Sequence, residues 1–105
     1  MENHLLIEGE LAESDALRFS PAGIPILRFR IRHQSRQREA GSVLETGFEL
    51  EVMAFDAQAR LLATTALGTM LKIRGFLDRK TRSGRAIVMH AREIEFVVGR
   101  KDQEI

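Results

Sequence analysis

The feature of this sequence that most constrains its fold is a set of short runs in which apolar and polar residues alternate one by one. Residues 27–32 read Leu-Arg-Phe-Arg-Ile-Arg, and residues 48–52 read Phe-Glu-Leu-Glu-Val. Successive side chains of a β-strand point to opposite faces, so this period predicts strands with one buried face and one solvated face. Further runs of the same kind occur at residues 5–7, 71–74 and 87–98. The pattern therefore predicts an all-β domain of short strands.

The segments between these runs carry residues that are typical of turns and loops. Residues 20–25, Ser-Pro-Ala-Gly-Ile-Pro, combine two prolines with a glycine and predict a fixed turn. Residues 33–42 and 78–85 are polar and predict two loops. Between Ala91 and Ile94 the apolar residues change parity, which predicts a bulge or a sharp bend in the last strand.

One segment, residues 56–67, favours a helix because it is rich in Ala and Leu. Asp56 is placed to cap its amino end, and Gly68 is placed to end it. The predicted order of three strands, a helix and two strands matches a five-stranded Greek-key OB-fold barrel with a short helical connector between strands 3 and 4. The pattern alone leaves a small sandwich or another small barrel open. We expect this domain at residues 1–98 and a flexible tail at residues 99–105.

Composition and residue spacing argue against several kinds of site. The chain has no cysteine, so it can form neither a disulfide nor a thiolate metal site. Its histidines, His4, His33 and His90, lack the spacing of metal ligands, and its glycines form no phosphate-binding motif. No apolar run approaches the roughly 18 residues of a membrane span, and the polar start is unlike a signal peptide. We therefore expect no metal, no cofactor, no catalytic site, no membrane contact and a cytoplasmic location.

Charge is divided into blocks along the chain, although the formal net charge is only +1. Residues 18–38 contain six arginines and no acid, and residues 39–56 contain five acids and no base. Basic residues predominate again between Lys72 and Arg92, where Asp78 is the only acid. Blocks of one sign can form charged faces on the folded protein even when the total nearly cancels.

Several short strings, in order and at matching intervals over most of the chain, resemble the PriB family of primosomal replication proteins. These strings are Ser20-Pro21-Ala22-Gly23-Ile24-Pro25, His33-Gln34-Ser35, Glu39-Ala40-Gly41, Gly75-Phe76, His90-Ala91 and Ile94-Glu95. The resemblance implies a fold similar to bacterial single-stranded-DNA-binding proteins, assembly as a homodimer, and a role in the restart of stalled replication forks. The partners that it implies are single-stranded DNA, the PriA helicase and, in some bacteria, the protein DnaT. It implies no catalytic site.

The strongest candidate for binding a nucleic acid is the basic segment at residues 79–85. Binding of an unpaired strand needs cations that follow the phosphates and flat side chains on which bases stack. The cations of this segment are Arg79, Lys80, Arg82 and Arg85. In the predicted OB-fold the segment joins strands four and five, a position that binds nucleic acid in such folds. A solvated charged loop without a ligand is the simpler alternative.

The first basic block supplies further candidates. Arg30 shares an outward strand face with Arg28 and Arg32, but cross-strand ion pairs with Glu49 and Glu51 are the simpler explanation of that trio. Arg18 precedes the fixed turn, at a position where members of the resembled family can carry a DNA-contacting cation. The remaining candidates are Arg36 and Arg38 in the predicted polar loop, and His33, for which a structural hydrogen bond is equally consistent.

The chain offers few aromatic side chains on which bases could stack, because it has six Phe but no Trp and no Tyr. Gly47 and Ser42 stand where the resembled family can carry stacking aromatics. The alternation at residues 48–52 predicts that Phe48 points inward. Phe76 shares parity with Lys72 and Arg74, which leaves a surface position open, but we expect it to pack in the core at a barrel bend. Since stacking contributes about 1–3 kcal/mol per base, binding should be mostly electrostatic and strongly dependent on salt.

Three functions therefore remain open from the sequence. The first is a non-catalytic protein that binds single-stranded DNA through basic loops and assembles with PriA during replication restart. The second is a protein-interaction adaptor of the primosome that keeps only weak DNA binding. The third is an OB-fold domain that binds RNA.

Overall fold

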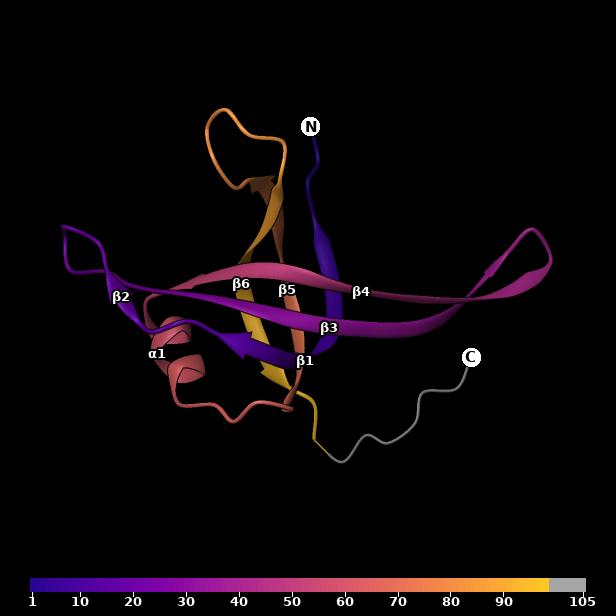
Figure 1. Cartoon of the computed structure of the whole chain (residues 1–105), viewed down its shortest axis with the longest axis horizontal. Helices are drawn as coiled ribbons and strands as arrows, with labels where there is room; N and C mark the ends of the chain where they lie inside the picture. The colour runs from indigo at the N-terminus through magenta and orange to yellow at the C-terminus, as the bar shows by residue number, and fades with distance from the viewer. Residues whose placement is uncertain (99–105) are drawn as a thin grey trace.

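The computed structural model describes residues 1–98 as seven elements, shown in Figure 1. The expected tail at residues 99–105 lies outside the described residues. The elements are β1 (Leu5–Ser14), β2 (Arg18–Phe19), β3 (Pro25–Glu39), β4 (Ser42–Phe55), α1 (Ala57–Ala63), β5 (Met70–Arg79) and β6 (Ile87–Phe96). Among these residues no helix is long and apolar enough to cross a bilayer.

The strands close into a five-stranded barrel. Their order in the sheet is β1-β5-β6-β4-β3-β2, and β1 also pairs with β3, which joins the two ends. All neighbours are antiparallel except β4 and β6, which run parallel. The two-residue β2 only extends β3, and α1 lies between β4 and β5, the third and fourth strands of the barrel. The predicted OB-fold barrel with a helical connector is confirmed, and the sandwich alternative is excluded.

Closure depends on β1, which passes from one neighbour to the other. Its first half pairs with β5, its second half pairs with β3, and the register slips between Leu11 and Glu13. Gly9 lies where the two pairings meet, and a Cβ atom there would stand 2.9 Å from the backbone oxygen of Arg32. A residue without a side chain therefore allows the barrel to close at this point.

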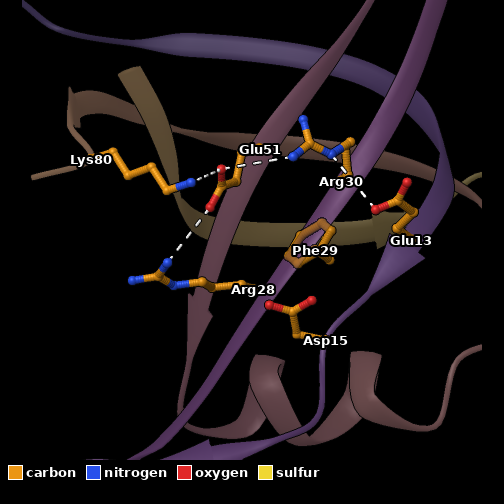
Figure 2. Close-up of a pocket in the computed structure, with 7 residues that line it drawn as sticks. All are labelled: Glu13, Asp15, Arg28, Phe29, Arg30, Glu51 and Lys80. Carbon is orange, nitrogen blue, oxygen red and sulfur yellow. Dashed lines mark ion pairs between the residues drawn. The ribbon is translucent and has the colours of Figure 1, made fainter. Parts of the chain in front are cut away.

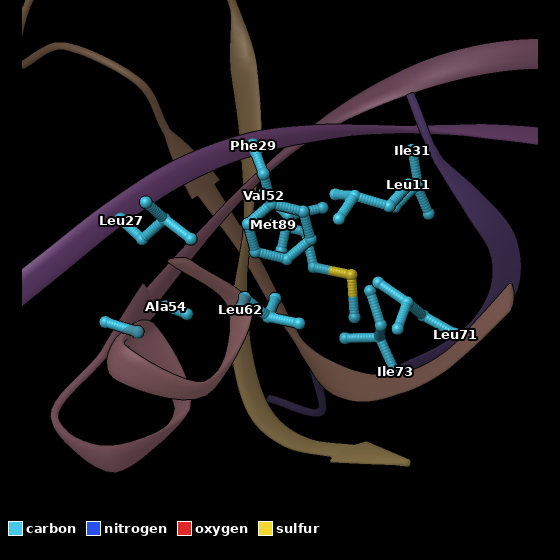
Figure 3. Packing of buried hydrophobic residues seen from close by; sticks show 11 residues of the cluster. Leu11, Leu27, Phe29, Ile31, Val52, Ala54, Leu62, Leu71, Ile73 and Met89 are labelled. Carbon is cyan, nitrogen blue, oxygen red and sulfur yellow. The ribbon is translucent and has the colours of Figure 1, made fainter. Parts of the chain in front are cut away.

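The inward residues of the alternating runs fill the barrel, as their period predicts (Figure 3). Helix α1 adds two apolar side chains from outside the sheet, and no polar or charged side chain is buried among residues 1–98. Burial of one large apolar side chain stabilises a fold by about 1.5–3 kcal/mol, so this cluster is the main source of stability. The cluster consists of Leu11, Leu27, Phe29, Ile31, Val52, Ala54, Ala59, Leu62, Leu71, Ile73 and Met89.

The helix is shorter than predicted, and its amino end differs from the predicted cap. Asp56 has a left-handed backbone (φ 58°) and makes no side-chain capping hydrogen bond, so the prediction of an Asp56 cap is wrong. The helix ends at Ala63 because the hydroxyl groups of Thr64 and Thr65 both donate to the carbonyl oxygen of Leu61. Threonine side chains compete in this way with helical hydrogen bonds.

The prediction of a polar loop at residues 33–42 is wrong. Strand β3 continues to Glu39, and β4 begins at Ser42, so that only Ala40 and Gly41 form the turn, with φ angles of 52° and 81°. Residues 33–48, here called the arm, extend beyond the barrel as a two-stranded ribbon (Figure 1). Neither face of the arm covers a core. Residues 33–39 of β3 are accordingly polar on both faces, and the alternation of apolar and polar residues that marks a half-buried strand is absent there.

The last two strands and the remaining turns agree more closely with the predictions from the sequence. The register between β5 and β6 shifts between Arg74 and Gly75 and leaves Arg92 without a partner in the strand register, which confirms the predicted bulge. Strand β5 runs to Arg79 and β6 begins at Ile87, so the loop occupies residues 80–86. It begins two residues later and ends one residue later than the predicted loop at residues 78–85. The fixed turn at residues 20–25 is confirmed as the connection between β2 and β3.

Candidate nucleic-acid interface

The connection between β5 and β6, with Arg79 at its start, is a hydrogen-bonded turn. We call residues 79–86 the basic loop. The amide of Lys80 donates to the carbonyl oxygen of Ala86 (2.8 Å), and the amide of Gly84 donates to Oγ1 of Thr81 (3.0 Å). Nη1 of Arg79 donates to the carbonyl oxygen of Arg82 (2.6 Å). The loop projects from one end of the barrel (Figure 1), and these bonds give it a defined shape.

The four cations of the basic loop are in different situations. Nζ of Lys80 lies 2.8 Å from Oε1 of Glu51 on β4, and the guanidinium of Arg79 is bound to the loop backbone. Arg82 and Arg85 are exposed, and neither forms an ion pair with an acid of residues 1–98. Of the four cations in the loop, only these two can therefore bind an anion without first breaking a contact within the protein.

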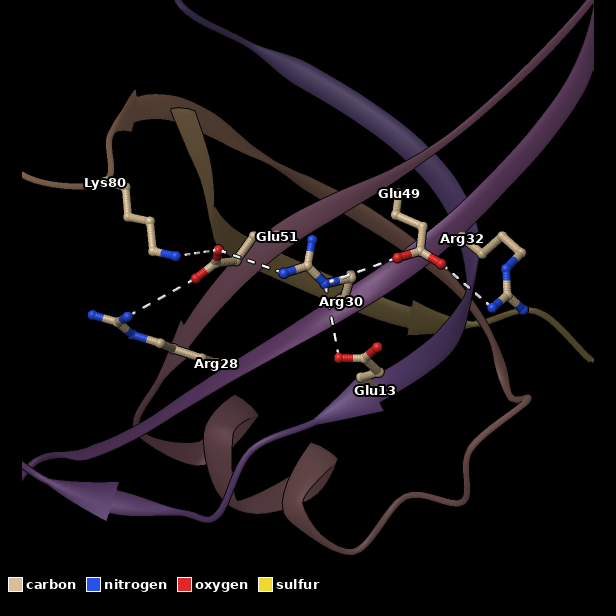
Figure 4. A network of polar contacts seen from close by, with 7 residues as sticks. All are labelled: Glu13, Arg28, Arg30, Arg32, Glu49, Glu51 and Lys80. Carbon is tan, nitrogen blue, oxygen red and sulfur yellow. Dashed lines mark hydrogen bonds and ion pairs between the residues drawn. The ribbon is translucent and has the colours of Figure 1, made fainter. Parts of the chain in front are cut away.

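The outward arginines of β3 lie within a ladder of carboxylates (Figure 4). Arg30 is 3.9 Å from Glu13, 3.9 Å from Glu49 and 4.0 Å from Glu51. Arg32 is 3.2 Å from Glu10 and 3.4 Å from Glu49. The contacts with Glu49 and Glu51 confirm the predicted cross-strand pairs, whereas those with Glu10 and Glu13 were not predicted. Exposed pairs of this kind contribute only about 0–1 kcal/mol each, but they neutralise the charge of this face.

An open pocket of about 140 Å³ lies beside this ladder (Figure 2). Its walls carry acids and bases together, so its charge does not favour a polyanion over a cation. Nε of Arg28 is buried there without an acceptor. No group of histidine and carboxylate side chains that could hold a metal ion occurs anywhere in residues 1–98. The pocket is lined by Glu13, Asp15, Arg28, Phe29, Arg30, Glu51 and Lys80.

The two arginines predicted in a loop lie instead on the strands of the arm. Arg36 forms an ion pair with Glu45 (3.6 Å). Arg38 is opposite Val43 in the strand register, is exposed, and has no ion pair within the described chain. Of the two, Arg38 at the tip of the arm is the cation available to a ligand.

His33 fastens the base of the arm to the barrel. Nδ1 of its ring donates to the carbonyl oxygen of Glu8 (2.6 Å), and Nε2 lies 2.8 Å from Oγ of Ser35, which is in turn 2.8 Å from Oγ1 of Thr46. Both ring nitrogens are therefore engaged within the protein. The geometry favours the structural alternative for His33 over direct contact with a strand of nucleic acid.

Phe48 does not point into the core, so that prediction is wrong. Its side chain is 45% exposed and stacks on the ring of His33 with 4.9 Å between centroids. At this position β4 has not yet entered the barrel, and no core lies under this face of the strand. The alternation of residues 48–52 correctly predicts that Phe48 shares a strand face with Leu50 and Val52. It does not show where along the strand the barrel ends.

At the other end of the β3–β4 ribbon, Arg18 is exposed on the short β2, beside an equally exposed Phe19. The guanidinium of Arg60 on α1 lies 5.6 Å from the centre of the Phe19 ring. Figure 1 shows β2 and the tip of the arm at opposite ends of the molecule. The predicted site residues therefore form three separate groups rather than one patch.

One aromatic cluster is not predicted by the sequence pattern. Phe76 on β5 stacks on His90 of β6 (4.9 Å between centroids), and His90 stacks on Phe55 of β4 (6.0 Å). The guanidinium of Arg92 lies 5.0 Å from the centre of the Phe76 ring. Phe76 is thus half-buried on the outer face, and its prediction as a core residue is wrong. A prediction of the β5–β6 register would have placed Phe76 opposite His90.

Several known proteins with similar sequences share one name or one family. A family described as another single-strand binding protein family matches residues 3–93. The replication restart protein PriB of Nitrosomonas europaea is 30% identical over 95 residues, which cover 90% of this chain and 88% of that protein. PriB of Yersinia pestis is 31% identical over 98 residues, covering 90% of this chain and 92% of the relative.

Solved structures agree with these matches. A structure of PriB from Ralstonia solanacearum superposes with a TM-score of 0.83 at 30% identity, covering 91% of this chain and 98% of the other. The single-stranded DNA binding protein of Thermus aquaticus superposes with a TM-score of 0.75 at 22% identity, covering 94% of this chain and 52% of that one, and shows the shared fold alone. From the family match over residues 3–93 and from these relatives, we conclude that this chain belongs to the PriB family of OB-fold proteins.

Proposed function

We propose that this protein is a non-catalytic subunit of the replication-restart machinery that binds single-stranded DNA through its basic loop. The observation that carries the proposal is the pair Arg82 and Arg85, exposed and without an acidic partner in residues 1–98, on a hydrogen-bonded loop of the barrel. Relatives that are 30–31% identical are named replication restart protein PriB, which supports the assignment to restart.

A guanidinium group suits this task because its planar set of donors matches two oxygens of one phosphate. A loop that is already ordered loses less conformational entropy on binding than a mobile one. Arg18 on β2 and Arg38 on the arm, also exposed and unpaired among the described residues, extend the same function to both ends of the β3–β4 ribbon. Arg30, Arg36 and Lys80 contribute less, because each is held by carboxylates.

The aromatic cluster of Phe55, Phe76 and His90 replaces part of the stacking surface that Gly47 and Ser42 lack. Phe76 lies on β5, three residues before Arg79 at the start of the basic loop, which is about 10 Å along a strand. We therefore expect a strand of DNA bound to the loop to reach it. Arg92 beside the Phe76 ring adds a cation at the same place. Stacking of one base on such a surface contributes about 1–3 kcal/mol.

The experiment is a fluorescence-anisotropy titration of labelled oligothymidine with the double variant Arg82→Ala/Arg85→Ala. We expect weaker binding at low salt and a slope of log affinity against log salt that is smaller by about 1.4, since each single-strand phosphate contact contributes about 0.7. The matched control is Arg32→Ala/Arg74→Ala, which removes the same charge from arginines that are paired with glutamates. Equal losses in the two variants would remove the basic loop from the site.

A second function, an adaptor that binds proteins and has only weak affinity for DNA, is favoured by the neutralised outer face of β3 and β4. A surface that alternates Arg30 and Arg32 with Glu49 and Glu51 suits a protein partner better than a polyanion. PriA is the partner we propose, with DnaT in some bacteria, for a homodimer of this chain. Capture of PriA in the absence of DNA, together with negligible oligothymidine binding at about 0.1 M salt, would favour the adaptor. A ribonucleotide oligomer of the same sequence tests RNA as the ligand.

A further inference from the structure

One carboxylate, Glu51, lies at the centre of three cations. Its Oε1 is 2.8 Å from Nζ of Lys80, its Oε2 is 4.0 Å from Nη1 of Arg28, and its Oε1 is 4.0 Å from Nη2 of Arg30 (Figures 2 and 4). The side chain of Glu51 is 14% exposed, whereas that of Glu49 on the same strand is 42% exposed. Partly buried pairs are screened by salt much less than exposed ones, so the contacts of Glu51 are weakened less by salt than those of Glu49. The 2.8 Å pair of Glu51 with Lys80 is also the shortest contact of the two sets.

These contacts connect the basic loop to the outer face of β3. Lys80 belongs to the basic loop, and Arg28 and Arg30 belong to β3, while Glu51 lies on β4 between them. The Lys80–Glu51 pair therefore fastens the basic loop to the wall of the barrel. Glu49, which contacts Arg30 and Arg32, makes no ion pair with the loop residues that the structure describes.

The same three cations would suit a phosphate group. A DNA phosphate and a glutamate carboxylate are both anionic oxygen acceptors, and they compete for the same guanidinium and ammonium donors. Nε of Arg28 is buried without an acceptor, so Glu51 does not use every donor of the cluster. While Glu51 occupies the centre of the cluster, a phosphate can bind there only after Lys80 has left the carboxylate.

We propose that Glu51 sets the affinity of this protein for single-stranded DNA by holding Lys80, and with it Arg28 and Arg30, away from the phosphates. The inference rests on the proposed function. The cations of the site then fall into two groups. Arg82 and Arg85 are free, whereas Lys80, Arg28 and Arg30 are held by Glu51. Removal of the Glu51 charge then allows the held cations to bind phosphates, although no residue is added to the site.

The test compares Glu51→Gln with Glu49→Gln, which removes the same charge from the same strand. In anisotropy titrations of oligothymidine, Glu51→Gln tightens binding by about three- to tenfold at low salt and steepens the salt slope by about 0.7 for each additional phosphate that the protein binds. Glu49→Gln has the smaller effect. The increase in affinity from Glu51→Gln is also smaller when it is measured in a Lys80→Ala background, because the two side chains are coupled.

Three results would overturn the inference: weaker binding by Glu51→Gln, an equal increase in affinity from Glu49→Gln, or an equal increase in the Lys80→Ala background. Amide hydrogen exchange of residues 80–86 provides a readout without DNA. Exchange rises in Glu51→Gln and not in Glu49→Gln if the Lys80–Glu51 pair fastens the loop. If the unsubstituted protein binds no oligothymidine, the proposed function fails. In that case, unchanged exchange would separately show that Glu51 does not hold the loop.

Discussion

Lys80 and Arg82 stand two positions apart in one loop and carry the same charge, yet only Arg82 is free. The difference arises from Glu51, a residue of another strand that lies 2.8 Å from the ammonium group of Lys80. A count of basic residues along the loop therefore overestimates the charge that a ligand meets. The environment of each cation, more than the number of cations, determines which of them can bind a phosphate.

Gly75 lies opposite the bulge in β6, where only a residue without a Cβ atom fits. A Cβ atom at this position would collide with the carbonyl oxygen of His90. We expect Gly75→Ala to lower the free energy of unfolding by about 1–3 kcal/mol, because the backbone must shift to admit the methyl group. Thermal denaturation followed by circular dichroism measures the loss. Gly47→Ala is the control, since its Cβ would meet the nearest atom, the His33 oxygen, at 3.6 Å. Equal melting temperatures for the two variants would contradict the expectation.

At the scale of elements, helix α1 closes the barrel core although only two of its residues are buried. Leu62 is fully buried, whereas its neighbour Leu61 is 45% exposed. We expect Leu62→Ala to destabilise the fold by about 2–5 kcal/mol, because it leaves a cavity in the core. Leu61→Ala should change stability far less. Chemical denaturation of both variants measures the contrast, and similar losses would show that the helix does not pack as described.

The arm is the other element whose behaviour depends on a few residues. An isolated two-stranded ribbon has little stability in water, and Ala40 in its turn has a left-handed backbone with φ 52°. This conformation costs a residue with a Cβ atom roughly 1–2 kcal/mol, whereas Asn before Gly is favoured in such turns. We therefore expect Ala40→Asn to slow amide hydrogen exchange in the arm.

The control for that measurement is Ala22→Asn in the turn between β2 and β3, where the residue does not have a positive φ. It should leave exchange in the arm unchanged. If Ala40→Asn also leaves it unchanged, the conformation of the turn does not limit the opening of the arm.

At the scale of the whole molecule, the free cations of the predicted site are distributed over distant parts of the surface. Arg18 lies on β2, Arg38 lies near the tip of the arm, and Arg82 and Arg85 lie on the basic loop. A strand that neutralises two to four of them should show a salt slope between about −1.4 and −2.8. A titration series with oligothymidine at rising salt measures this slope. An affinity that does not change with salt would mean that stacking, rather than charge, dominates the binding.

Much of the architecture could be predicted from the sequence, and several of the errors concern where the barrel ends. The strands, the bulge near Arg92 and the ion pairs between β3 and β4 were predicted, because period-two alternation determines which residues face one another across neighbouring strands. The arm, the exposure of Phe48 and the position of Phe76 were not. The arm and the exposure of Phe48 depend on where the barrel ends. The outer position of Phe76 agrees with its parity with Lys72 and Arg74, and its ring contacts depend on which strand lies next to β5.

The sequence by itself determined that this chain forms a small all-β domain with outward cations, since alternation, turn residues and charge blocks are properties of neighbouring residues. The pairing of β1 with β3, which closes the barrel, is a property of the tertiary structure. Only the tertiary structure decided which of those cations are free. Lys80, Arg30 and Arg36 are held by carboxylates of β4, whereas Arg82, Arg85 and Arg38 have no ion pair among residues 1–98. The physical reason is that Coulomb attraction acts through space over a few ångströms, and closure of the barrel brings together charges that are far apart along the chain.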